Sequence, residues 1–212
     1  MAKAGTKYVG RERGDHLGAT TPPGYLYTDE GILRQELETF YNRSWLNVGR
    51  EEQIPDAGDF FTRAIGDESV IVLRGTDGKV RAFYNVCRHR GTRLIEEAEG
   101  KKLRSVVCPY HAWTYSTEGA LVGAPHTDEL VDFRKEDYGL HPVRLESWGG
   151  FLWANLDADA PTMRKELGRF LEKFDRFPLA DLRLVSRKTY TVEANWKILV
   201  QNYQECYHCA PI

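Results

Sequence analysis

The sequence predicts a mainly β protein with flanking helices, an α+β fold in which an antiparallel β domain is followed by the start of a second α+β domain. Three observations support this fold class. Short alternating or apolar runs follow one another between residues 45 and 156, turn-forming residues separate them, and amphipathic helical patterns lie on either side. Period-two alternation is typical of half-buried strands, and short turns between such runs are typical of antiparallel hairpins.

The first 44 residues predict an arm and one helix. Residues 1–24 are polar and rich in Gly, Pro and Thr, without periodicity. From residue 28 to residue 44, apolar side chains recur at helical spacing behind Thr28, a candidate N-cap. We expect one amphipathic helix that packs on the domain behind it.

A series of short runs predicts the strands of the β domain, which we place at residues 45–157. Turn residues between the runs favour an antiparallel sheet. The last two runs are joined at Gly149-Gly150 and predict a hairpin that closes the sheet. The expected strands are residues 45–48, 59–65, 69–74, 80–84, 103–107, 112–115, 121–122, 142–148 and 151–156.

Residues 158–212 predict the beginning of the second domain. Residues 161–174 form a helical pattern that starts at a proline, and residues 183–192 alternate as a strand does. A last helical pattern begins near residue 195, and we expect its apolar side to be buried. The side chains on that side are Trp196, Leu199, Val200, Tyr203 and Tyr207.

Composition excludes several classes of protein. The formal net charge of −2 gives no electrostatic footprint for nucleic acid or for an anionic membrane surface. The first residues lack the apolar core of a signal peptide, and nowhere do about 18 apolar residues run together. Four cysteines provide no disulfide framework. We therefore expect a cytoplasmic protein with no nucleic-acid or membrane partner.

Two pairs of metal-ligating residues lie close together in the β domain. Cys87-x-His89 and Cys108-x-x-His111 each follow an apolar, β-branched run and precede a Gly or an aromatic residue, so we expect each pair in a loop at the end of a strand. Two thiolates and two imidazoles suit zinc or an iron–sulfur centre, and the ligand types leave both metals open.

The motifs Cys87-Arg-His89-Arg-Gly91 and Cys108-Pro-Tyr-His111-Ala-Trp113 resemble those of the Rieske family. The resemblance implies a [2Fe–2S] cluster with the two cysteines on the inner iron and the two histidines on the outer iron, which changes oxidation state. Neither loop carries the extra cysteine of respiratory Rieske proteins, so the resemblance is to the oxygenase-type branch. A zinc-stabilised interaction domain is the alternative without redox activity.

Three arginines surround the first pair. Arg88, Arg90 and Arg93 fit a solvated surface, a set of charges that offsets thiolate and sulfide, or a docking surface for an electron donor.

A second candidate site lies near the end of the chain. Glu205 and His208 are three residues apart and share a helix face, a pattern that by itself fits a polar surface as well as a 2-His-1-carboxylate iron site. The run Asn202-x-x-Glu205-x-Tyr-His208 resembles the catalytic helix of Rieske non-haem iron oxygenase α subunits. The resemblance implies that His208 is the first ligand of a mononuclear Fe(II), that Glu205 bridges to the cluster of a neighbouring subunit, and that Asn202 lies behind the ligands.

The match stops before the site is complete. The second histidine is expected just after Ile212, and the third ligand, a carboxylate, far downstream. We therefore expect a truncated catalytic domain, helix-grip-like by resemblance, and a chain that is inactive alone. Cys206 and Cys209 form a Cys-x-x-Cys that is open to half a zinc site or a redox pair.

The resemblance implies the N-terminal part of an oxygenase α subunit, of either the aromatic-ring-hydroxylating or the quaternary-ammonium type. Such a protein takes electrons from a flavin- or ferredoxin-type reductase through the cluster to an Fe(II), which activates O2 to hydroxylate or demethylate a small organic substrate. A homotrimer is expected for the full-length form. The segment Glu205-Cys-Tyr-His-Cys209 resembles the corresponding sequence of oxygenases that act on quaternary ammonium compounds. The alternative is a Rieske ferredoxin-like electron carrier with no oxygenase activity of its own.

Overall fold

The structure, a computed structural model, describes residues 22–204, so Glu205, Cys206, His208 and Cys209 lie outside the described residues. Two compact units are present in the described chain. The smaller comprises residues 22–36 and 187–204, and the larger comprises residues 37–186. No helix between residues 22 and 204 combines the length and apolar character that crossing a membrane demands.

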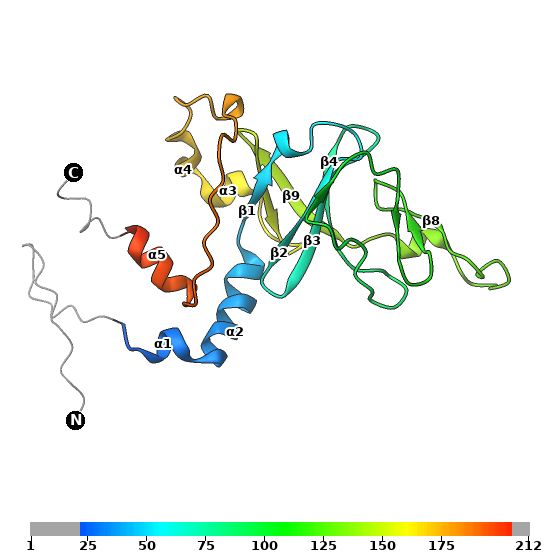
Figure 1. Cartoon of the computed structure of the whole chain (residues 1–212), viewed down its shortest axis with the longest axis horizontal. Coiled ribbons are helices and arrows are strands. Elements are labelled where there is room, and N and C mark those ends of the chain that lie inside the picture. Colours follow the sequence, from blue (N-terminus) through cyan, green and yellow to red (C-terminus); the bar gives the residue numbers. More distant parts are fainter. Residues whose placement is uncertain (1–21, 205–212) are drawn as a thin grey trace, which may run out of the picture. The chain divides into compact units, whose positions relative to one another are not determined.

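An antiparallel seven-stranded sheet forms the body of the larger unit (Figure 1). Its strand order is β1-β10-β9-β4-β3-β2-β5, which confirms the antiparallel β domain. The two-residue strand β5 was not predicted because it is too short to show alternation. The strands are β1 (Leu46–Arg50), β2 (Phe60–Ile65), β3 (Glu68–Arg74), β4 (Val80–Tyr84), β5 (Glu99–Gly100), β9 (Pro142–Trp148) and β10 (Phe151–Asn155).

Strand β3 lies between two hydrophobic cores. Val70 and Val72 belong to the core on one side, and Ile71 and Leu73 belong to the core on the other. All four side chains are fully buried. Because successive side chains point to opposite faces of a strand, burial on both faces explains the unbroken apolar run at this position.

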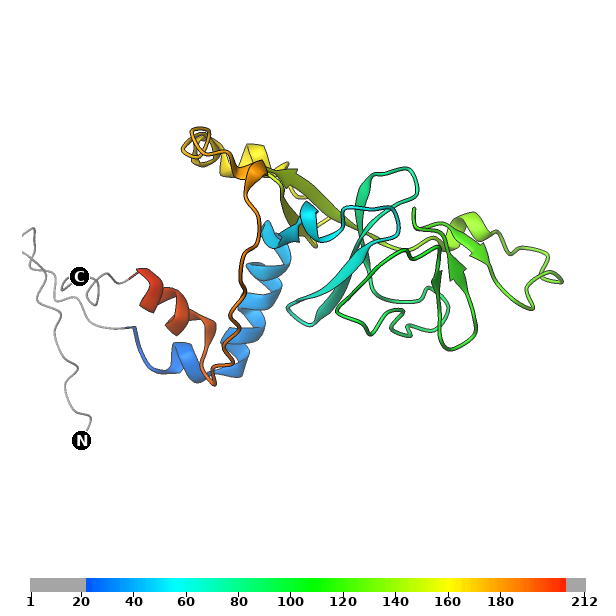
Figure 2. The same ribbon diagram turned by 45° about the horizontal axis from the view of Figure 1, so that its top comes forward.

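A smaller three-stranded sheet packs on one of these cores. Its strands are β6 (Val106–Val107), β7 (Thr114–Tyr115) and β8 (Leu121–Gly123), in the order β6-β7-β8. Figures 1 and 2 show this sheet at the end of the larger unit that lies away from α3 and α4. Strand β7 begins later than predicted because residues 108–113 form a loop with hydrogen bonds of its own. Strand β6 is also shorter than predicted, whereas β8 is one residue longer.

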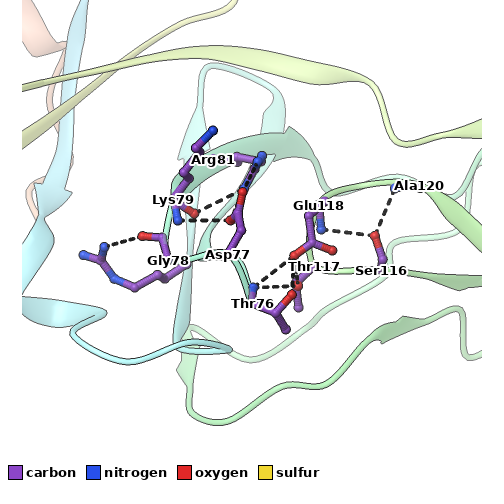
Figure 3. A network of polar contacts seen from close by, with 10 residues as sticks. Thr76, Asp77, Gly78, Lys79, Arg81, Ser116, Thr117, Glu118 and Ala120 are labelled. Carbon is purple, nitrogen blue, oxygen red and sulfur yellow. Dashed lines mark hydrogen bonds and ion pairs between the residues drawn. The ribbon is translucent and has the colours of Figure 1, made fainter.

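Polar contacts join a hairpin turn of the large sheet to a hairpin turn of the small one (Figure 3). The Thr76 hydroxyl, from the β3–β4 turn, donates to Glu118 Oε1 at 2.7 Å, and the Thr76 backbone N–H donates to the same oxygen at 3.0 Å. Thr117, from the β7–β8 turn, donates its hydroxyl to Glu118 Oε1 at 2.7 Å. These contacts fix the small sheet against the large one.

The closing hairpin forms as predicted. Strands β9 and β10 pair directly, with Trp148 opposite Phe151, and the connection is the two-residue turn Gly149-Gly150. Both glycines have positive φ, 56° and 78°. Two positive φ values give a turn whose twist matches that of the flanking strands, and glycine adopts them at little cost.

The N-terminal helix differs from the single helix predicted at residues 28–44. It is divided into α1 (Tyr25–Thr28), α2 (Glu30–Thr39) and a 3-10 turn (Tyr41–Arg43). Asp29 has an extended ψ of 118°, and its side chain accepts the Ile32 N–H at 3.1 Å. Asp29, rather than Thr28, therefore caps α2.

The helix predicted at residues 161–174 is also broken. It forms α3 (Met163–Leu167) and α4 (Arg169–Glu172), separated by Gly168 at φ 47°. A positive φ ends a right-handed helix. Further 3-10 turns are Glu51–Gln53, Lys135–Tyr138 and Leu179–Asp181.

The smaller unit contains α1, the beginning of α2 and α5 (Trp196–Gln204), so the last predicted helix is present. Figure 2 shows α5 beside α1. Leu199 and Val200 are 40% and 41% exposed, so the expected burial of this side is wrong for the described chain. The strand predicted at residues 183–192 is also absent, and Val185 and Tyr190 there are 96% and 78% exposed. A strand needs a neighbour, and no described strand pairs with these residues.

Candidate metal centre

Two loops from different sheets carry the predicted ligands. The first, residues 87–92, follows β4 of the large sheet, and the second, residues 108–113, connects β6 to β7 of the small sheet. Both loops therefore lie at strand ends, as the sequence predicted.

The two loops repeat one hydrogen-bond pattern. The Cys87 backbone N–H donates to the Thr92 carbonyl at 2.8 Å, and the Cys108 N–H donates to the Trp113 carbonyl at 2.8 Å. Each cysteine carbonyl in turn accepts an N–H from the residue four positions later. Each loop is thus closed by its own backbone, which fixes its cysteine and histidine independently of any metal.

The loops bring thiols to the inside and imidazoles to the outside. Cys87 and Cys108 are each 3% exposed, carry no disulfide and belong to one hydrophobic core. His89 and His111 are exposed, and their ring centroids lie 4.8 Å apart. The side chains predicted as ligands therefore lie in two loops of the larger unit, with both cysteines buried in one core and both imidazole rings exposed and adjacent.

Aromatic side chains hold both imidazole rings. The ring of Trp113 stacks on that of His89, with centroids 4.9 Å apart and an interplanar angle of 11°. The ring centroids of Tyr110 and His111 lie 3.7 Å apart. Phe133 and Tyr138 pack edge-on against Trp113. The orientation of the imidazoles is thus set by packing, as a preorganised ligand set requires.

Tyr115 contacts the first cysteine directly. Its hydroxyl lies 3.3 Å from Cys87 Sγ and accepts the Arg88 backbone N–H at 3.0 Å. Tyr115 is fully buried, and this burial, with the bond to Cys87, raises the pKa of its hydroxyl. The hydroxyl stays protonated, so it is able to donate to a thiolate at Cys87.

Sequence reasoning did not single out Tyr115, Phe133 or Tyr138. A signal for Tyr115 was present, because it stands two residues after Trp113, and period-two spacing in extended chain predicts that both side chains point to the same core. No local signal pointed to Phe133 or Tyr138. Both residues follow β8 in the sequence and contact Trp113 only because the chain folds back toward it.

The arginines of the first loop differ in their roles. The Arg88 guanidinium donates to the Gly139 carbonyl at 2.7 Å, so it tethers the loop to the chain before β9. Arg93 pairs with Glu96 at 3.5 Å and donates to the Ser69 hydroxyl at 3.2 Å. Arg90 is exposed. A simple solvated surface therefore describes Arg90 but not Arg88.

An open groove of about 510 Å³ runs beside the two imidazoles. Its walls include Arg88, Arg90, His126 and Leu130. Desolvation, with the charges of His111 and Arg90 nearby, lowers the pKa of His89, which favours the neutral, metal-binding form of its imidazole. The groove gives another molecule access to the two imidazoles.

The arrangement fits a binuclear centre better than a single zinc ion. A structural zinc needs four ligands around one point. Among residues 22–204, no three His, Cys, Asp or Glu side chains converge as a mononuclear metal requires. Two buried thiols and two exposed imidazoles match the ligand types of a [2Fe–2S] centre in which two cysteines and two histidines bind different irons.

Comparison with known families agrees with this geometry. The Rieske [2Fe-2S] domain family matches residues 44–134, and the catalytic domain of the ring hydroxylating alpha subunit family matches residues 179–212. The carnitine monooxygenase oxygenase subunit of Acinetobacter baumannii is 37% identical over 195 residues, covering 91% of this chain and 52% of that protein. The chain is thus similar to Rieske oxygenase alpha subunits over both matched segments.

Other Rieske oxygenases are similar in sequence and in structure. The glycine betaine monooxygenase oxygenase subunit of Pseudomonas aeruginosa is 35% identical over 92% of this chain and 44% of its own length. The crystal structure of the quaternary ammonium Rieske monooxygenase CntA with gamma-butyrobetaine superposes with a TM-score of 0.83 at 36% identity, covering 89% of this chain and 55% of that one. This chain thus spans about half the length of the curated relatives it matches.

The second candidate site is only partly described. Asn202 lies on α5 and is exposed, and Glu205 and His208 lie outside the described residues.

Proposed function

We propose that Cys87, His89, Cys108 and His111 bind a [2Fe–2S] cluster, and that residues 45–157 form the domain that carries it. The observation that supports this most strongly is the burial of both thiols beside two exposed, adjacent imidazoles. When bound, such a cluster supplies one-electron transfer at a potential of roughly −150 to +300 mV.

The residues around the cluster perform separate tasks in this proposal. Cys87 and Cys108 hold the inner iron in the core, where water is excluded, while His89 and His111 present the outer iron to the groove. Tyr115 donates a hydrogen bond to Cys87 Sγ, which stabilises negative charge at the sulfur. Arg90 on the groove wall offers a positive charge to an acidic, reductase-type electron donor.

For the whole protein we propose a Rieske non-haem iron oxygenase whose catalytic domain begins within residues 158–212. His208 is the first ligand of a mononuclear iron, Glu205 the acid that links this iron to the cluster of a neighbouring subunit in a trimer, and Asn202 a supporting residue. The match of residues 179–212 to the catalytic domain family supports these assignments. When bound, the iron supplies O2 activation for oxidation of a small organic substrate.

The substrate class that we propose is a quaternary ammonium compound. The relatives named for carnitine and glycine betaine support it, as does the resemblance of residues 205–209 to oxygenases of such compounds. An aromatic substrate is the competing class, because the biphenyl 2,3-dioxygenase alpha subunit of Rhodococcus jostii is 39% identical over 86% of this chain.

The decisive experiment is EPR spectroscopy of the anaerobically purified chain after dithionite reduction, with iron and sulfide assayed on the same sample. We expect a rhombic Rieske signal and equal amounts of iron and sulfide. Cys108→Ser abolishes the signal, whereas Cys209→Ser, which removes a cysteine outside the two loops, preserves it. A colourless protein that contains zinc and gives no EPR signal would overturn the proposal.

A further inference from the structure

Helix α5 has few apolar contacts to hold it. It carries Asn202 and leads into Glu205 and His208, and it is nine residues long. None of its residues is buried, and residues 198–204 are exposed. Isolated helices shorter than about 12 residues are marginal in water, so specific contacts must hold α5 in place.

One carboxylate makes the strongest of these contacts. Lys197 Nζ lies 2.7 and 2.8 Å from the two carboxylate oxygens of Glu36 on α2, and the Trp196 indole N–H donates to Glu36 Oε2 at 2.9 Å. The side chains of Glu36 and Lys197 are 21% and 17% exposed. Charge-assisted hydrogen bonds at half-buried positions are stronger than those between exposed groups.

Other contacts of α5 are weaker or act only within the helix. The Lys197 ammonium lies 5.9 Å from the centroid of the Tyr27 ring. Tyr27 donates to Gln201 at 3.0 Å in an exposed position. The Asn195 side chain accepts the Lys197 backbone N–H at 3.1 Å and caps the helix, but it does not join α5 to another element.

The contact made by Glu36 fixes rotation as well as position. Trp196 and Lys197 are consecutive residues, so their side chains leave the helix about 100° apart. A single carboxylate that binds both side chains therefore restricts the rotation of α5 about its axis. The direction in which later residues of the helix point follows from that rotation.

We propose that Glu36 is a positioning residue for α5, the helix that carries Asn202, acting through Lys197 and Trp196. The inference rests on the proposed function, since it assigns Glu36 a part in placing Asn202. Residues 22–36 thus form one unit with α5, although they precede the cluster domain in the chain.

Amide hydrogen exchange in the complete 212-residue chain tests this proposal. In Glu36→Gln we expect the amides of residues 200–204 to exchange about tenfold faster, because a charge-assisted bond is lost. Lys197→Met produces the same loss from the other partner. Glu38→Gln, the same change at an exposed position of α2, leaves the exchange rates unaltered.

Exchanging the two charges is the rescue experiment. Glu36→Lys combined with Lys197→Glu restores most of the protection, since the exchanged charges also suit the dipoles of both helices. Amides of β3 serve as the internal measure of global folding. Unchanged exchange at residues 200–204 in both Glu36→Gln and Lys197→Met would refute the positioning role.

The same samples separate this proposal from the proposed function. The Rieske EPR signal should be equal in the wild type and in every variant at positions 36 and 197. A wild type without that signal refutes the cluster assignment, and the exchange data still decide whether Glu36 holds α5.

Discussion

Gly91 and Ala112 occupy equivalent positions in the loops at residues 87–92 and 108–113. Each lies four residues after a cysteine and donates its backbone N–H to the carbonyl of that cysteine at 3.0 Å. Each also has a positive φ, 71° for Gly91 and 56° for Ala112. Both loops therefore require a left-handed backbone conformation at this position. Glycine adopts this conformation without steric strain, whereas alanine adopts it at a cost in conformational free energy.

This equivalence predicts opposite effects for opposite substitutions. Gly91→Ala should lower the free energy of unfolding by about 1 kcal/mol, and Ala112→Gly should raise it by up to about 1 kcal/mol. A Cβ added at Gly91 meets no atom within 4 Å, so backbone strain is the sole expected cost. Urea denaturation measures both changes. Equal destabilisation by the two substitutions would show that left-handed strain is not what distinguishes the loops.

Tyr115→Phe should lower the reduction potential of the cluster. The Tyr115 hydroxyl lies 3.3 Å from Cys87 Sγ, and a donor to a ligating sulfur stabilises the reduced, more negative state. Loss of about 1 kcal/mol of differential stabilisation corresponds to roughly 40 mV for one electron. Protein-film voltammetry gives the potential directly. Tyr110→Phe removes an exposed hydroxyl beside His111 as the control, and a potential that is unchanged in Tyr115→Phe would contradict the expectation.

Acid should weaken the junction between the two sheets. Hydrogen bonds from Thr76 and then Thr117 lower the pKa of Glu118 from its usual 4.5 to about 2 (Figure 3). Because the folded pKa is the lower one, the stabilisation is complete above about pH 4.5 and is lost as the pH falls toward 2.

Urea titrations at several pH values test this dependence. Between pH 6 and pH 3, Glu118→Gln should lose less stability than the wild type, because it has no carboxylate to protonate at that position. Glu129→Gln, which removes an exposed carboxylate, should follow the wild-type curve. Parallel curves for Glu118→Gln and the wild type would argue against a role for this carboxylate.

Arg50 should stabilise the attachment of residues 179–182, which follow the β domain, to strand β1. Its guanidinium donates to the carbonyls of Leu179 and Leu182 at 3.2 and 2.8 Å and lies 3.4 Å from Glu52. Arg50→Met leaves these carbonyls and the Glu52 carboxylate without that partner. We expect a loss of about 1–3 kcal/mol and faster tryptic cleavage at Arg183.

The matched control is an exposed ion pair. Arg134 and Asp137 are 71% and 50% exposed, so Arg134→Met should leave the free energy of unfolding almost unchanged. Similar losses in Arg50→Met and Arg134→Met would mean that burial adds nothing to the Arg50 contacts. Limited proteolysis and urea denaturation together measure both variants.

Elements with strong local signals were predicted correctly. Alternating or apolar runs predicted six of the seven strands of the large sheet, all except β5, and Gly149-Gly150 predicted the hairpin turn. The helices were less accurate, because Gly168 adopts a positive φ in the middle of a helical pattern and Asp29 competes with Thr28 as the cap. Apolar periodicity does not report a change in the backbone at one residue.

Local sequence was sufficient to locate the two loops at residues 87–92 and 108–113. Each cysteine and its histidine lie within one short segment, so spacing and residue type revealed them, and the flanking strands were visible as apolar runs. The resemblance to the Rieske family rests on the same two motifs.

The contacts around those loops could be identified from the tertiary structure alone. The contact between Tyr115 and Cys87 joins residues that are 28 apart in sequence, Arg88 reaches Gly139 across 51 residues, and Lys197 reaches Glu36 across 161. Such contacts arise when strands and helices pack, and many partners of the right chemistry exist along the chain. Which partner is used depends on how distant elements pack, and the local sequence does not contain that information.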